Sequence, residues 1–110
     1  MNNSNAKAEI SFRFNRLDKM QAFTLEREIL GSLRIDNIES NFYTVFVPLS
    51  DNNLDDINDY YVRQRIEIEN CDIFVSVCSD AGTKSFDIPV IVNRMLKYID
   101  CKLTFSFTVT

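Results

Sequence analysis

The sequence contains no histidine and no tryptophan, and only two glycines and two prolines among its 110 residues. The absence of histidine removes the usual general base and the commonest zinc ligand of proteins. With two glycines, the chain cannot form a glycine-rich loop that binds phosphate. Its apolar runs are short, such as residues 45–47 and 90–92, and are too short for a membrane span or a signal peptide. These absences favour a binding protein over an enzyme.

The remaining composition is typical of a folded protein. Hydrophobic residues make up 45% of the chain, charged residues 25% and aromatic residues 12%, which argues against disorder and low complexity. A chain of this length predicts one domain, residues 1–110, with a polar lead-in at residues 1–7. No linker or internal repeat divides it.

The three cysteines, Cys71, Cys78 and Cys101, are expected to be free thiols in a reducing cytoplasm. Cys71 and Cys78 are seven residues apart in one predicted strand, so their side chains point to opposite faces and cannot bridge each other. A bridge to Cys101 on a neighbouring strand stays possible. We interpret Cys78 as a small hydrophobic residue and not as a nucleophile, since no basic cluster adjoins it.

Period-two alternation predicts four strands, at residues 9–14, 42–49, 66–79 and 103–109. The phase of the third changes near Glu69, which indicates a bulge or a break. Three helices are predicted between them. The first starts at Asp18, which with Gln21 matches a capping box, and ends near Gly31, where positive φ is expected. The second covers residues 54–64.

The third predicted helix has apolar residues at helical spacing over residues 88–99, with Asp87 as its cap. The resulting order is β-α-β-α-β-α-β. Without the middle helix it becomes β-α-β-β-α-β, the ferredoxin-like unit. We therefore predict a single-domain α+β sandwich, ferredoxin-like, with an extra helix between the second and third strands. Polar outer faces on the first and last strands favour an antiparallel sheet, and a parallel α/β sheet is the alternative.

No metal or cofactor is expected. Residues 51–59 superficially resemble a calcium loop, but Asp56 stands where such a loop needs glycine and Val62 stands where it needs glutamate. The same residues are better explained as the capped start of the second helix. Carboxylates alone do not predict a catalytic site here, so we expect no enzyme activity.

The charge of the chain is acidic and uneven. Twelve basic residues face 16 acidic ones, a net charge of -4, which argues against nucleic acid and anionic membranes as partners. Residues 51–72 hold seven of the acids and only two bases. Such a concentration of negative charge is typical of a surface that steers association with a cationic protein. The alternative is an ordinary solvated surface.

The second helix holds the candidate site. Tyr61 has the helical spacing of Leu54 and Ile57, so we expect Tyr61 in the core and Tyr60 exposed. The acidic residues there share an exposed face, on which Asp59 precedes Arg63 in the favourable i, i+4 order. The predicted partner-binding residues are Asp55, Asp56, Asp59, Tyr60 and Arg63.

Two short segments carry a resemblance. The step Ile29-Leu30-Gly31 after the first helix, and Phe86-Asp87-Ile88-Pro89 before the last, resemble those of a group of small uncharacterised bacterial α+β domains. Together with its size and acidity, the chain is similar to bacterial immunity proteins, in particular those of contact-dependent growth inhibition systems. That resemblance implies a cytoplasmic antitoxin that binds and blocks a basic nuclease toxin. It carries no residue-level function.

A second hypothesis needs no toxin. The chain could be a homo-oligomeric structural or ligand-binding domain without catalytic activity. Exposed sheet faces and edges often mediate such pairing, and the last predicted strand has a polar outer face of Thr104, Ser106 and Thr108. A homodimer is therefore the alternative to a toxin partner.

Overall fold

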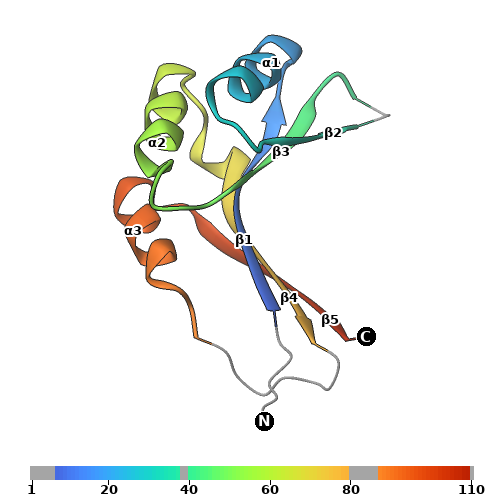
Figure 1. Ribbon diagram of the computed structural model, residues 1–110. Helices are drawn as coiled ribbons and strands as arrows, with labels where there is room; N and C mark the ends of the chain where they lie inside the picture. The colour runs from blue at the N-terminus through green and yellow to red at the C-terminus, as the bar shows by residue number, and fades with distance from the viewer. Residues whose placement is uncertain (1–6, 38–39, 80–86, 110) are drawn as a thin grey trace.

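The computed structural model describes residues 7–37, 40–79 and 87–109. These residues form a five-stranded mixed sheet and three helices (Figure 1). The elements, in chain order, are β1 (Lys7–Leu17), α1 (Lys19–Glu28), β2 (Leu33–Asp36), β3 (Tyr43–Pro48), α2 (Leu54–Arg63), a 3-10 turn η1 (Ile68–Asn70), β4 (Cys71–Ser79), α3 (Val90–Tyr98) and β5 (Lys102–Val109).

The strands lie in the order β2-β3-β1-β4-β5. Pairs β2–β3, β3–β1 and β1–β4 are antiparallel, whereas β4 and β5, which α3 connects, are parallel. All three helices lie on one side of the sheet (Figure 1), so none of the described residues forms a helix over the other side. We call the uncovered side the open face.

The hydrophobic core fills the space between the sheet and the helices. Alternate residues of each long strand point into it, as period two requires. In β1 these are Phe12 and Phe14, and in β4 they include Ile73 and Val75, all fully buried. The helices contribute their apolar stripes, including Leu25 of α1. Burial of this kind is the main stabilising contribution to such a domain.

The α+β class and the single domain are confirmed, but the exact ferredoxin-like order is not. Two features differ from the prediction. The short strand β2 precedes β3, which makes α2 the helix between the third and fourth strands, and β5 lies parallel to β4. β2 was missed because it is short: Leu33 and Ile35 alternate with Arg34 and Asp36, but four residues are the minimum for a period-two signal, and none of the four is buried.

Local signals were mostly predicted correctly. Asp18 and Gln21 form the capping box of α1, and Gly31 has a φ of +87°. The phase change near Glu69 is the turn η1. The cap at Asp87 is wrong, because α3 begins only at Val90, after an extended Pro89. Phe86 lies outside the described residues. In the described part of the chain, every helix is too short or too polar to cross a membrane.

Candidate protein-binding site

Helix α2 presents the predicted acidic residues to solvent. Its apolar stripe turns inward and is buried, and its first turn carries Asp55 and Asp56, where the helix dipole favours negative charge. Asp55, Asp56 and Asp59 are all exposed. The structure therefore places the three predicted carboxylates together on the outer surface of one helix.

Arg63 connects this helix to α1. Its Nε donates to Asp59 at 2.9 Å, the predicted i, i+4 pair, and its two terminal nitrogens donate to the carboxylate of Glu28. These hydrogen bonds, first to Glu28 and then to Asp59, raise the pKa of Arg63. Both acids are thus partly neutralised and held in fixed positions.

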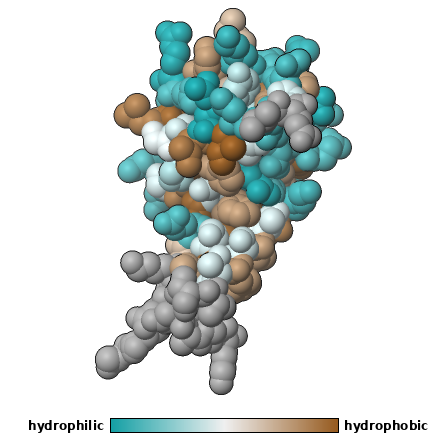
Figure 2. Space-filling model, turned by 90° about the vertical axis from the view of Figure 1, so that its right-hand side faces the viewer, coloured by the Kyte–Doolittle hydropathy of each residue, from teal (hydrophilic) through white to brown (hydrophobic). Residues whose placement is uncertain are grey.

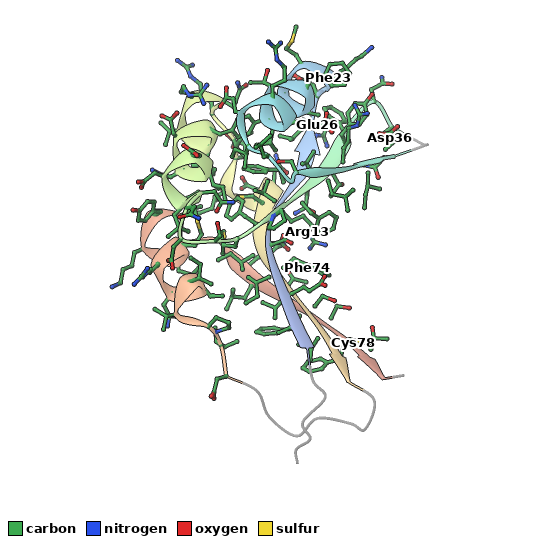
Figure 3. The ribbon with its side chains drawn as sticks, in the orientation of Figure 1. Arg13, Phe23, Glu26, Asp36, Phe74 and Cys78 are labelled. Atoms are coloured by element: carbon green, nitrogen blue, oxygen red, sulfur yellow. The ribbon has the colours of Figure 1, made fainter. Side chains whose placement is uncertain are left out.

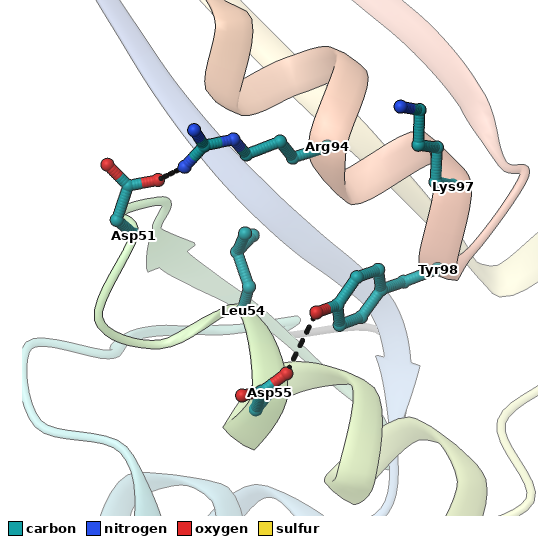
Figure 4. A pocket seen from close by; sticks show the side chains of 6 residues that line it. All are labelled: Asp51, Leu54, Asp55, Arg94, Lys97 and Tyr98. Atoms are coloured by element: carbon teal, nitrogen blue, oxygen red, sulfur yellow. Dashed lines mark hydrogen bonds and ion pairs between the residues drawn. The ribbon is translucent and has the colours of Figure 1, made fainter.

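A cleft of about 260 Å³ separates the start of α2 from α3 (Figure 4). Arg94 of α3 donates to Asp51 at 2.5 Å on one side, and the Tyr98 hydroxyl donates to Asp55 at 2.9 Å on the other. Leu54 and Lys97 complete the lining. The hydrogen bond to Asp55, followed by the charge of that carboxylate, raises the pKa of Tyr98.

The predicted exposure of Tyr60 is wrong. Its side chain is fully buried, its hydroxyl donates to the backbone carbonyl of Gln21 at 2.7 Å, and its ring meets Phe14 edge-to-face at 5.2 Å. Burial, and then the charges of Asp18 and Glu28, raise its pKa. Tyr60 therefore anchors α2 to the core and is not available to a partner.

The helical geometry explains the error. At about 100° per residue, Tyr60 and Tyr61 lie on either side of Ile57, about 60° and 40° away from it. Spacing alone cannot choose between them. The neighbouring elements decide, because α1 and Phe14 lie on the side of Tyr60, whereas Tyr61 is half-buried on the other side.

The exposed tyrosine beside charged residues is Tyr98 of α3, whereas the sequence predicted it at Tyr60 of α2. Tyr98 is 46% exposed and lies beside Asp55, Arg94 and Lys97. The apolar spacing of the last predicted helix does not include position 98, so its exposure could have been predicted. Its hydrogen bond with Asp55, 43 residues away in the sequence, could not.

We define the α2 face as the exposed surface that these residues share. It has five acids against three bases, and Asp56 forms no ion pair with any residue that the structure describes. Its net charge is therefore negative. Its members are Glu28, Asp51, Asp55, Asp56, Asp59, Arg63, Arg94, Lys97 and Tyr98.

Three acids of the 51–72 segment lie outside the α2 face: Glu67 and Glu69, which are exposed beyond the end of α2, and Asp72. Asp72 of β4 points to the open face, yet it is fully buried, because Arg13 donates to it twice and Thr104 donates to it at 2.6 Å. Burial would raise its pKa, but these hydrogen bonds and the Arg13 charge hold the pKa below its ordinary value. Asp72 therefore belongs to a closed ion pair and not to the α2 face.

The cysteines and carboxylates do not form a metal site within the described ranges, where no group of three or more such ligands gathers. All three cysteines are free. Cys71 and Cys101 are buried neighbours at the start of β4 and just before β5, and a hydrogen bond between their thiols, together with burial, raises the pKa of Cys71. Cys78 is exposed, as the opposite-face prediction requires.

Comparison of the chain with protein-family models, with curated proteins and with solved structures found no match.

Proposed function

We propose that this protein acts by binding and not by catalysis, as an immunity-type inhibitor that blocks a basic nuclease toxin with its α2 face. The observation that supports this most is the Asp55–Tyr98 pair beside the cleft between α2 and α3. It brings an exposed carboxylate and an exposed aromatic ring together at a hollow of about 260 Å³. Tyrosine and arginine are the residues that most often anchor protein interfaces.

The α2 face would recognise a cationic side chain in two ways. A guanidinium from the partner would stack on the Tyr98 ring and donate to the free oxygen of Asp55. Asp56, which has no ion pair among the described residues, would accept a second lysine or arginine. These carboxylates would occupy the groove that otherwise holds the phosphates of the toxin's nucleic acid, and substrate would be excluded sterically and electrostatically.

The ion pairs within the face prepare it for binding. Arg63 fixes Asp59 and Glu28, and Arg94 fixes Asp51, so fewer rotamers have to be ordered when a complex forms. Long-range attraction would come from the net negative charge of the face and would raise the association rate at low salt.

We further infer the fold type of this protein and its location in the cell. The first six main elements follow one another as β-α-β-β-α-β with four antiparallel strands, which supports a ferredoxin-like unit extended by α3 and β5. The three free cysteines support a reducing, cytoplasmic location.

Affinity capture tests the proposal. Tagged protein is incubated with lysate of the native host, with toxin expression induced, and bound protein is eluted along a salt gradient and identified by mass spectrometry. We expect one basic protein with nuclease activity that the pure chain inhibits at equimolar ratio. A captured partner without nuclease activity, or a nuclease that stays active when saturated with the chain, contradicts the proposal.

A further inference from the structure

The open face of the sheet carries a group of exposed and half-buried apolar side chains that the proposed function does not use. We define the apolar patch as Leu33 and Ile35 of β2, Phe46 of β3 and Phe74 of β4. Leu33 is 61% and Ile35 46% exposed. The strand register places all four side chains on this side of the sheet, and Figure 2 shows apolar surface in the middle of this face with hydrophilic surface around it.

The apolar patch is concave, and its aromatic side chains pack against one another. A depression of about 270 Å³ lies among its side chains, lined also by Glu9, Ser11 and Ser76. Beside it, the rings of Phe46 and Phe74 pack edge-to-face at 5.6 Å, and the Arg13 guanidinium lies 4.5 Å from the centre of the Phe74 ring. Arg13 and Phe74 both point away from the helices (Figure 3). A rigid hollow beside protruding aliphatic side chains is suited to an interface.

The charges of the open face favour a second copy of this chain as the occupant. Arg13 and Asp72 neutralise each other within one molecule. The register also places Lys7 beside Cys78, Glu9 beside Ser76 and Lys102 beside Asp72 on this side, so the open face, unlike the α2 face, has no excess of acidic positions. A cationic partner would find little to attract it there, whereas two copies meet with their strongly acidic α2 faces kept apart on opposite outer sides.

The dimensions also suit a dimer. Five strands about 4.8 Å apart and roughly 25 Å long offer about 600 Å² of projected area, and more of accessible area, close to the ~800 Å² per partner of a stable interface. The small side chains of Ser11 and Ser76 allow a second sheet to approach to about 10 Å. Under a two-fold axis, Leu33 and Ile35 of each copy would fill the hollow of the other.

We propose that the open face is the interface of a homodimer, in which two copies pack sheet to sheet through the apolar patch. The α2 face lies on the helix side of each copy and stays available (Figure 1). The dimer is independent of the proposed toxin binding, since a charge reversal in α2 leaves it intact and an open-face variant leaves the α2 face intact.

Sedimentation velocity over a range of protein concentrations tests the proposal. The wild-type chain is expected to shift reversibly from monomer to dimer as the concentration rises. Leu33→Lys and Ile35→Lys are expected to weaken the dimer about tenfold or more, as loss of a side chain that anchors an interface in a pocket does. Val62→Lys is the matched control, because Val62 is 62% exposed on the helix side, and it is expected to dimerise as the wild type does.

Lysine is well tolerated on edge strands, so the β2 variants should fold, and circular dichroism checks this. If they do not, methyl NMR of the wild type decides: the Leu33 and Ile35 signals should move with concentration while those of Val62 stay fixed. A wild type that is monomeric at every concentration overturns the proposal. So does a dimer that the β2 variants leave unchanged, or one whose NMR shifts map to the helix side. A monomer that loses a captured partner on Ile35→Lys assigns the face to that partner instead.

Discussion

The buried ion pair on the open face makes a sharp prediction about stability and its pH dependence. Arg13 and Asp72 form two hydrogen bonds, but their exposures differ: the Arg13 side chain is 21% exposed and the Asp72 side chain 1%. Removal of the arginine leaves a buried carboxylate with only neutral donors, the side chains of Thr104 and Asn15. Removal of the carboxylate leaves a guanidinium that can turn to water.

Substitution of Arg13 and substitution of Asp72 should therefore lower the free energy of unfolding by different amounts. Arg13→Met keeps an apolar side chain against Phe74 but leaves the buried carboxylate of Asp72 without its counterion. This should lower the free energy of unfolding by about 3 kcal/mol. Asp72→Asn keeps an oxygen that accepts from Thr104 and leaves no unpaired charge in the interior. It should lower the free energy of unfolding by about 1–2 kcal/mol. Arg94→Met, which breaks an ion pair with both side chains more than half exposed, is the matched control and should cost less than about 1 kcal/mol.

The pH dependence of the stability should have opposite signs in the wild type and in Arg13→Met. In the wild type the pKa of Asp72 is lowered in the folded state, so its stabilisation is complete above the unfolded pKa of about 3.9 and is lost as the pH falls through the lower folded pKa. In Arg13→Met, burial without the arginine raises that pKa above the unfolded one. This variant should therefore recover stability as the pH falls from 7 toward about 4.

Urea unfolding followed by circular dichroism at several pH values measures both effects. The double variant should lose less free energy of unfolding than the two single variants lose together, because Asp72→Asn removes the charge that Arg13→Met leaves unpaired. Equal losses of stability in Arg13→Met and Asp72→Asn, with parallel pH profiles between pH 7 and 4, would show that Arg13 does not compensate a buried charge on Asp72.

Two further predictions concern the core. A thiol reagent should alkylate Cys78 rapidly in the native protein, because only it is exposed, whereas Cys71 and Cys101 should react only after unfolding; peptide mapping of the labelled sites checks this, and fast labelling of all three would contradict the burial. Tyr60→Phe should destabilise the chain by about 1 kcal/mol through loss of its hydrogen bond to the α1 backbone. Tyr98→Phe, at an exposed position, should change stability by less than about 0.5 kcal/mol, and equal losses in urea unfolding would count against the assigned positions.

The sequence predicted those elements whose faces differ in polarity. β1 and β4 have one face in the core, so their alternation was clear, and α2 was predicted to within one residue. That Cys71 and Cys78 point to opposite faces followed from their odd separation, but the exposure of Cys78 did not, since its place after an apolar run favoured a small hydrophobic residue. β2 was not predicted because the alternation of Leu33 and Ile35 with Arg34 and Asp36 covers only four residues, none of which is buried.

The candidate site was predictable only in part. The carboxylates of α2 are exposed because they lie off its apolar stripe, and Asp59 pairs with Arg63 because the two are one helical turn apart. Contacts over long sequence separations were not accessible. Neither the link from Arg63 to Glu28 nor that from Tyr98 to Asp55 has a local signature, and the position of α1 was needed to decide that Tyr60 is buried.

The most direct test of the proposed function compares two charge reversals of equal size. Asp55→Lys with Asp56→Lys changes the α2 face, whereas Glu67→Lys with Glu69→Lys changes two exposed acids beyond the end of α2. Capture of the basic partner by each double variant is measured beside the wild type at fixed salt. The account predicts that the α2 pair loses most of the captured partner and the control pair retains it. Equal retention by both, or equal loss, would contradict it, since binding would then not depend on the α2 face.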